Sequence, residues 1–121
     1  MRHASTLLLP LLLAADWPQW RGPNRDGHAP DVTLPAAWPD KAPEPRWKVP
    51  AGDGYAGLCV AGGTAFVHDR VGGNERVRAL DADTGKERWA VDYPEAFQAP
   101  DPTAGKGPNA TPAFDRDRVY T

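Results

Sequence analysis

A short pattern that occurs twice constrains the fold of this chain more than any other feature of its sequence. Residues 46–49 read RWKV and residues 88–91 read RWAV, so the same unit returns roughly 40 residues later. A second pair of segments, residues 59–67 and 113–121, also aligns, because each places a short turn between two apolar runs. A repeat of this length indicates one supersecondary unit that is used more than once and packs against its own copies.

Between the repeats, the sequence has the features of short β-strands joined by tight turns. Gly62 and Gly63 separate two apolar runs, and paired glycines supply the positive φ angles that a two-residue hairpin turn needs. The chain holds 14 prolines and 12 glycines beside five tryptophans, which favours turns and large packing surfaces over helices. We therefore expect an all-β fold, with strands near residues 46–49 and at 58–61, 64–68, 76–80 and 87–91, a polar loop at 69–75, and a hairpin built from 113–114 and 118–121.

The stretch ALDADTGKERW, which begins at Ala79, admits two readings. Asp81 and Asp83 are the kind of neighbouring carboxylates that a calcium loop uses, but such a loop needs about six to eight oxygens. The basic residues that follow would also repel a cation. The alternative is a turn between two strands, in which an aspartate side chain accepts backbone N–H groups and Gly85 takes a positive φ angle. The sequence favours the turn.

The same stretch carries a resemblance to a known family. Its pattern A-x-D-x-x-T-G-K-x-x-W is similar to the repeat of the PQQ-like, quinoprotein-type β-propeller proteins. The resemblance implies β-propeller blades of four antiparallel strands, in which Ala79 and Trp89 make a tryptophan-docking contact between adjacent blades and Gly85 forms the turn. The residues assigned to blade docking are Ala79, Asp81, Thr84, Gly85 and Trp89, together with Trp47 of the preceding repeat.

Three regions follow one another along the chain. Residues 1–15 place a leucine-rich run before two small residues, the layout of a secretory signal peptide, with a buried helix start as the alternative. The run is too short to cross a bilayer, which takes ~20 apolar residues. Residues 16–45 form an extended segment rich in tryptophan and proline, and its start, DWPQWRGPNRDG, is similar to that of a group of exported bacterial propeller proteins. Residues 46–121 are assigned to PQQ-like β-propeller repeats.

The number of repeats leads to a further expectation. A propeller closes with ~4–8 blades, whereas this sequence supplies one blade and the start of a second. A single blade would expose apolar faces and an unpaired strand edge. We therefore expect the chain to be the N-terminal part of a longer protein.

Two classes of function fit these features. The first is an exported propeller that acts as a binding or scaffold module in the cell envelope, periplasmic or secreted, with other envelope or extracellular proteins as partners. The second, implied by the resemblance, is a quinoprotein dehydrogenase that uses pyrroloquinoline quinone and Ca²⁺ to oxidise an alcohol or a sugar. We favour the first, because the single cysteine, Cys59, cannot form the adjacent cysteine pair of the alcohol dehydrogenases and no residue here stands out as a catalytic, cofactor or metal ligand.

The remaining candidates are weaker. With 14 Lys and Arg against 16 Asp and Glu, no basic stripe supports binding to nucleic acid. Cys59 lies between apolar residues and is expected in the core. His68 and Asp69 are adjacent and are either an acid–base pair or, as we expect, separate structural residues, with the histidine hydrogen-bonded at a strand end. The segment NRDG, which ends at Gly27, is expected to form a tight turn.

Overall fold

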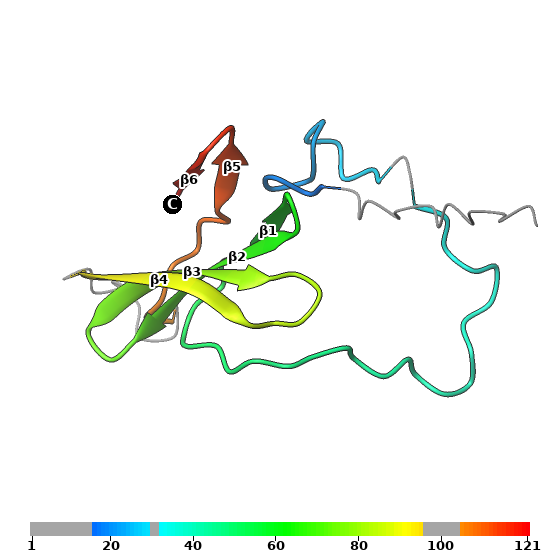
Figure 1. Ribbon diagram of the computed structural model, residues 1–121, viewed down its shortest axis with the longest axis horizontal. Helices are drawn as coiled ribbons and strands as arrows, with labels where there is room; N and C mark the ends of the chain where they lie inside the picture. Colours follow the sequence, from blue (N-terminus) through cyan, green and yellow to red (C-terminus); the bar gives the residue numbers. More distant parts are fainter. Residues whose placement is uncertain (1–15, 30–31, 96–104) are drawn as a thin grey trace, which may run out of the picture.

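The structure of this chain, a computed structural model, is all-β. It describes residues 16–29, 32–95 and 105–121, and no helix occurs in those ranges. The six strands are β1 (Leu58–Ala61), β2 (Thr64–Val71), β3 (Asn74–Asp81), β4 (Glu87–Pro94), β5 (Ala113–Asp115) and β6 (Arg118–Tyr120). The first four form one antiparallel sheet in the order β1-β2-β3-β4, and β5 and β6 form a separate hairpin (Figure 1). The all-β prediction is confirmed, and the signal-peptide prediction for residues 1–15 lies outside the described residues.

The turns of the sheet follow from its glycines. Gly62 and Gly63 have φ angles of 54° and 70°, as the hairpin between β1 and β2 requires. The predicted polar loop at residues 69–75 is wrong, because β2 and β3 pair along their whole length and only Gly72 and Gly73 lie between them. The physical reason is a bidentate ion pair that joins the two strands beside the turn.

That ion pair forms between neighbouring positions of β2 and β3. Asp69 and Arg76 are partners in the strand register, and the Arg76 Nε and Nη2 atoms lie 2.9 and 2.7 Å from the two carboxylate oxygens. The Asp69 side chain is only 4% exposed, so this pair is shielded from water. Polar residues that look like a loop in the sequence are therefore compatible with a continuous ladder, since they satisfy one another across it.

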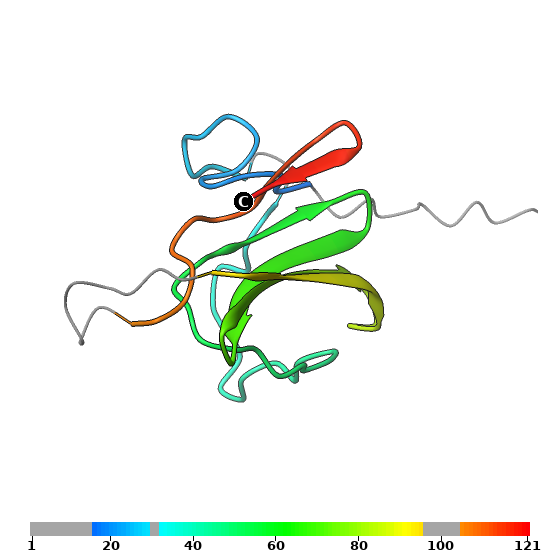
Figure 2. The ribbon, with the colours of Figure 1, turned by 90° about the vertical axis from the view of Figure 1, so that its left-hand side faces the viewer.

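The two faces of the sheet are covered by different parts of the chain. The face that carries Phe66 (the Phe66 face) lies against the β5–β6 hairpin, and the Phe66 and Phe114 rings stack with centroids 5.2 Å apart. Cys59 and Ala79 lie on the same face and are fully buried. The segment that contains Trp47 runs along the opposite side of the sheet (Figures 1 and 2). The core is therefore built between the sheet and the hairpin.

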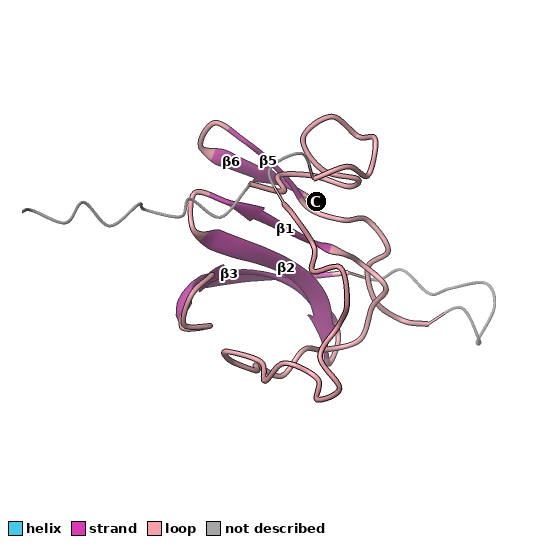
Figure 3. Cartoon of the chain, turned by 90° about the vertical axis from the view of Figure 1, so that its right-hand side faces the viewer, coloured by secondary structure: helices cyan, strands magenta, loops and turns pink. Residues whose placement is uncertain are grey.

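The N-terminal segment joins the sheet to the hairpin. Trp17 exchanges two backbone hydrogen bonds with Val60 of β1, with N···O distances of 2.7 and 2.9 Å, and the Pro18 carbonyl accepts the Phe114 N–H of β5 at 2.7 Å. Residues 32–45 beyond it are exposed and form no strand, as predicted for this region (Figure 3). The predicted turn at Gly27 is confirmed, since Gly27 has a φ of 76° and the Asp26 carboxylate accepts the N–H two residues on.

The strand predicted near residues 46–49 is wrong. The segment is extended but pairs with no strand. A few residues later, Asp53 forms an isolated β-bridge with Arg70 of β2. The segment is held instead by contacts to the turn after β3 and by the Arg78 guanidinium, which donates to the Pro50 carbonyl at 2.8 Å. Without a neighbouring strand in register, an extended segment of this kind makes side-chain contacts and no sheet.

Candidate docking surface

The turn between β3 and β4 is organised by one carboxylate. Asp81 Oδ1 accepts the N–H groups of Asp83 and Thr84 at 3.1 and 2.9 Å and the Thr84 hydroxyl at 2.8 Å. Asp81 Oδ2 accepts from Arg88 at 2.8 Å. The bond from Arg88 and then those from Thr84 lower the pKa of Asp81 to about 2. The predicted turn is confirmed, because this carboxylate is occupied by the turn itself.

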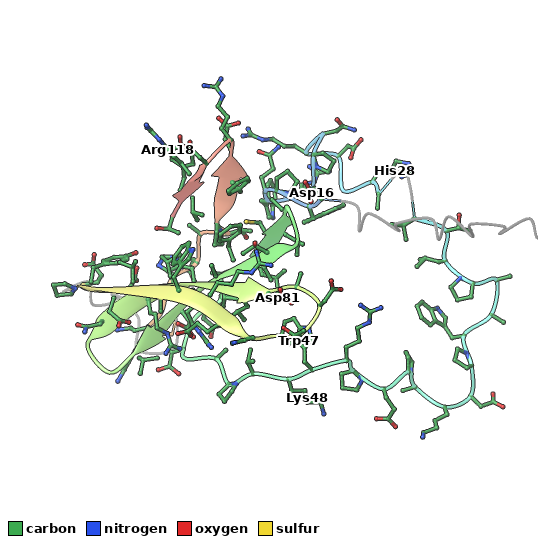
Figure 4. The ribbon with its side chains drawn as sticks, viewed as in Figure 1. Asp16, His28, Trp47, Lys48, Asp81 and Arg118 are labelled. Atoms are coloured by element: carbon green, nitrogen blue, oxygen red, sulfur yellow. The ribbon has the colours of Figure 1, made fainter. Side chains whose placement is uncertain are left out.

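The indole of Trp47 packs onto this turn at Gly85. A Cβ built on Gly85 would lie 2.7 Å from Trp47 Cδ2, and Gly85 has a φ of 72°. The Trp47 Nε1–H donates to the Ala82 carbonyl at 3.0 Å, and the neighbouring Arg46 lies 3.0 Å from an Asp83 carboxylate oxygen. Figure 4 places Trp47 directly beside the turn that carries Asp81. Glycine is required here for two reasons, the positive φ angle and the space that the ring fills.

The second tryptophan of the repeat lies on β4. Trp89 is the register partner of Ala79, and its ring centroid is 6.0 Å from that of Phe66. The register shifts between Ala79 and Leu80, which leaves Arg88 as an extra residue. Such a bulge bends a strand and re-aims its side chains. Here it lets Arg88 reach both Asp81 and the Thr64 hydroxyl while Trp89 still faces Ala79.

The outer half of the Phe66 face is open. Trp89 and Val91 keep 42% and 55% of their surface exposed, whereas Ala79 beside them is fully buried. The β5–β6 hairpin contacts β1, and Thr121 after β6 hydrogen-bonds Tyr93 near the end of β4, while Trp89 and Val91 stay partly exposed. Large apolar side chains on one face of an edge strand are the pattern of a surface that another element covers. We call the surface formed by Trp89 and Val91 the docking surface.

The structure brings the sequence-predicted docking residues to one end of the sheet. Five of them, Ala79, Asp81, Thr84, Gly85 and Trp89, come from β3, its turn and β4, and Trp47 reaches the turn from far along the chain. The contributions of the Ala82 carbonyl and of Arg88 were not foreseen. The role of Arg88 could have been predicted, because an arginine precedes the tryptophan in both copies of the repeat (Arg46-Trp47 and Arg88-Trp89).

His68 and Asp69 do not form an acid–base pair. They point to opposite faces of β2, where His68 Nε2 lies 3.1 Å from Glu75 and Asp69 pairs with Arg76. Burial acts to raise the pKa of Asp69, but the hydrogen bonds from Arg76 and from the Gly52 N–H outweigh it and hold the pKa below its usual value. The predicted hydrogen bonding of His68 is confirmed, but the residue lies in the interior of β2 and not at a strand end. Cys59 is in the core, as predicted.

Comparisons with known proteins find no relative of this chain. A scan against protein-family models finds no matching model, and searches of curated proteins and of solved structures find no match. In the described ranges, no three His, Cys, Asp or Glu side chains gather as a metal site would require, and no helix is long and apolar enough to cross a membrane.

Proposed function

We propose that the β1–β4 sheet is one blade of a PQQ-like β-propeller and that the protein is a binding or scaffold module of the cell envelope. The observation that carries this proposal is the packing of Trp47 on Gly85. One RW repeat sits on the turn of this sheet from the side opposite the β5–β6 hairpin, while the second RW repeat lies on β4 with its ring half-open. In a ring of sheets, each would contact the turn of the next.

The covering of both faces supports the same arrangement. A blade inside a propeller is buried on its two sides by its neighbours. Here the β5–β6 hairpin packs on the Phe66 face and the segment that carries Trp47 packs on the other. In this proposal, β5 and β6 are the inner strands of a neighbouring blade, and residues 46–49 correspond to the outer strand of the blade on the other side.

The docking surface then has a defined occupant. Trp89 would pack on a glycine turn of a neighbouring sheet, as Trp47 packs on Gly85. Covering a tryptophan and a valine that are about half exposed removes further apolar surface from water, which contributes roughly 25 cal/mol for each Å² buried. A scaffold role follows from the architecture, because a propeller presents its loops around a channel while its blades hold one another rigidly.

The environment of Trp89 tests the blade proposal. A variant with phenylalanine at the other four tryptophan positions would report Trp89 alone. We expect iodide to quench its fluorescence readily in the isolated 121-residue chain, and much less in the protein isolated from the cell envelope, where a neighbouring sheet covers the ring. Equal quenching in both preparations would rule out the covered docking surface.

Export and cofactor use need separate tests. We propose that residues 1–15 direct the chain to the periplasm or outside the cell; a fusion of these residues to a reporter enzyme that works only outside the cytoplasm would show activity, and a fusion that starts at Asp16 would not. The dehydrogenase alternative predicts a quinone absorbance band when pyrroloquinoline quinone and Ca²⁺ are added, together with dye reduction by alcohols or sugars. For a binding module, neither signal appears.

A further inference from the structure

Three polar side chains meet on the Phe66 face beside the docking surface. His68 Nε2 lies 3.1 Å from Glu75 Oε2 and 2.9 Å from the Tyr93 hydroxyl, and that hydroxyl donates to the same Glu75 oxygen at 3.0 Å. They belong to β2, β3 and β4 respectively. Since Glu75 can only accept, Nε2 carries the proton in the neutral ring, and Nδ1 is left as an acceptor.

That acceptor has no hydrogen-bond partner among the described residues. The His68 side chain is 4% exposed, and Nδ1 is one of two buried side-chain atoms in the described ranges that lack a partner. A buried polar atom without a partner is costly, and such an atom calls for an explanation. For the neutral ring with its proton on Nε2, the group that satisfies Nδ1 brings an N–H or O–H donor.

A cavity of about 550 Å³ lies at this place. Its wall consists of His68, Glu75, Tyr93, Glu95, Gly107, Pro108, Asn109, Ala110 and Thr121. The wall offers two carboxylate side chains, an amide and a histidine, and it contains no lysine or arginine. Arg70, the register partner of Glu75, donates to the Glu95 backbone carbonyl at 2.9 Å and is not part of the wall. The wall is therefore rich in acceptors, and Glu75 contributes a carboxylate to it.

The cavity and the docking surface lie on the same face of the sheet. The register places His68 opposite Val77 and Val77 opposite Val91, so His68 and Val91 share one face. An element that covers Trp89 and Val91 would lie beside Tyr93, which is two residues further along β4 and lines the cavity. Its apolar side chains would meet the docking surface, and a long side chain beside them would meet the carboxylates.

We propose that this cavity binds a nitrogen cation, the guanidinium or ammonium group of an arginine or lysine side chain on the element that covers the docking surface. A guanidinium brings several N–H donors in one plane and an ammonium brings three, so either can serve the Glu75 carboxylate and offer a donor toward His68. This inference rests on the proposed docking of a neighbouring sheet, and it adds the chemistry by which that partner is recognised.

Small cations test the cavity directly. The 121-residue chain, with ¹³C,¹⁵N-labelled histidine, is titrated with propylguanidinium and with butylammonium at constant ionic strength, while the His68 ring signals are followed by NMR. Propylurea, a neutral molecule of the same shape as propylguanidinium, serves as the matched control. We expect saturable shifts with one or both cations and none with propylurea. Equal shifts with propylurea, or no saturable shift with either cation, would overturn the proposal.

Three variants separate charge from misfolding. Glu75→Gln keeps an acceptor for His68 and Tyr93 and removes the charge, so we expect the affinity for the cation to fall about tenfold. Asn109→Asp adds a carboxylate to the wall and is expected to raise the affinity, an effect that misfolding cannot produce. Glu44→Gln alters a carboxylate that is 77% exposed and paired with Lys41, and is expected to change nothing. Unaltered affinity in both wall variants would contradict the proposal.

The outcome is distinguishable from that of the blade proposal. Suppose that the cavity binds the cations but iodide quenches Trp89 equally in both preparations. The cation site would then be supported, but a neighbouring sheet could not be the source of the cation. A protected Trp89 in a chain whose cavity ignores both cations would leave the blade arrangement intact and refute the cation site.

Discussion

The indole of Trp47 occupies the space in which a side chain at Gly85 would begin. The contact joins residues that are far apart in the sequence, and it is strengthened by the Nε1–H bond to the Ala82 carbonyl in the same turn. Because Trp47 belongs to one copy of the RW repeat and Gly85 to the turn before the other, this contact links the two copies physically.

Gly85→Ala should destabilise the chain by about 2 kcal/mol, because the methyl group would displace the ring and a positive φ angle disfavours alanine. Gly63→Ala is the matched control. Gly63 has a similar φ of 70°, but a Cβ there meets nothing within 4 Å, so only the backbone cost of about 1 kcal/mol applies. Urea unfolding followed by circular dichroism measures both. Equal losses would mean that Trp47 contributes nothing at Gly85.

Trp47→Phe should lower the free energy of unfolding by about 1 kcal/mol, since it keeps a ring over Gly85 and removes the donor to Ala82. Trp38→Phe is the control, because Trp38 is 66% exposed and its replacement should leave the midpoint of urea unfolding unchanged. If both variants unfold at the same urea concentration as the parent chain, the Nε1–H bond does not stabilise the turn.

Acid should weaken the β3–β4 turn only at very low pH. The folded pKa of Asp81 is about 2, lowered by Arg88 and then by Thr84, whereas an unfolded aspartate titrates near 3.9. A carboxyl with a depressed folded pKa stabilises the fold above its unfolded pKa, and this stabilisation is lost as the pH falls from about 4 through 2. NMR titration of the Asp81 carboxyl carbon checks the value. Arg88→Gln should move the midpoint upward, and an unchanged midpoint would show that Arg88 is not the main cause.

The thiol of Cys59 should be unreactive in the folded chain. Burial raises its pKa to about 11, and the side chain is fully enclosed between the sheet and the hairpin. At pH 8, a thiol reagent should therefore modify Cys59 far more slowly in buffer than in 6 M guanidinium, because the reactive species is the thiolate. Rapid modification without denaturant would indicate that the β5–β6 hairpin opens readily.

The sequence predicts the parts of this fold that local chemistry determines. The Gly62-Gly63 hairpin was foreseen because two glycines between apolar runs have one dominant use. The turn at Asp81 was foreseen because its side chain can cap nearby N–H groups and Gly85 tolerates the necessary φ angle. These signals are contained in a few neighbouring residues, so no knowledge of the rest of the molecule was needed.

The errors come from contacts between distant residues. The segment at residues 46–49 has the composition of a strand, yet whether it joins a sheet depends on a partner in register, which no local pattern reports. Asp69 looks like a loop residue in the sequence, but it pairs with Arg76 across β2 and β3. The cavity at His68 was invisible for the same reason, since its wall is assembled from three strands and a later loop.

The bond between the Pro18 carbonyl and the Phe114 N–H has a consequence for the order of events as the polypeptide is made. The two residues are roughly 100 positions apart, and contacts of such long sequence separation form late. Pro18 leaves the ribosome well before Phe114 is made, so this bond cannot form until synthesis has passed residue 114. If the protein is exported through a pore that accepts unfolded chains, this delay would help to keep the polypeptide unfolded for translocation.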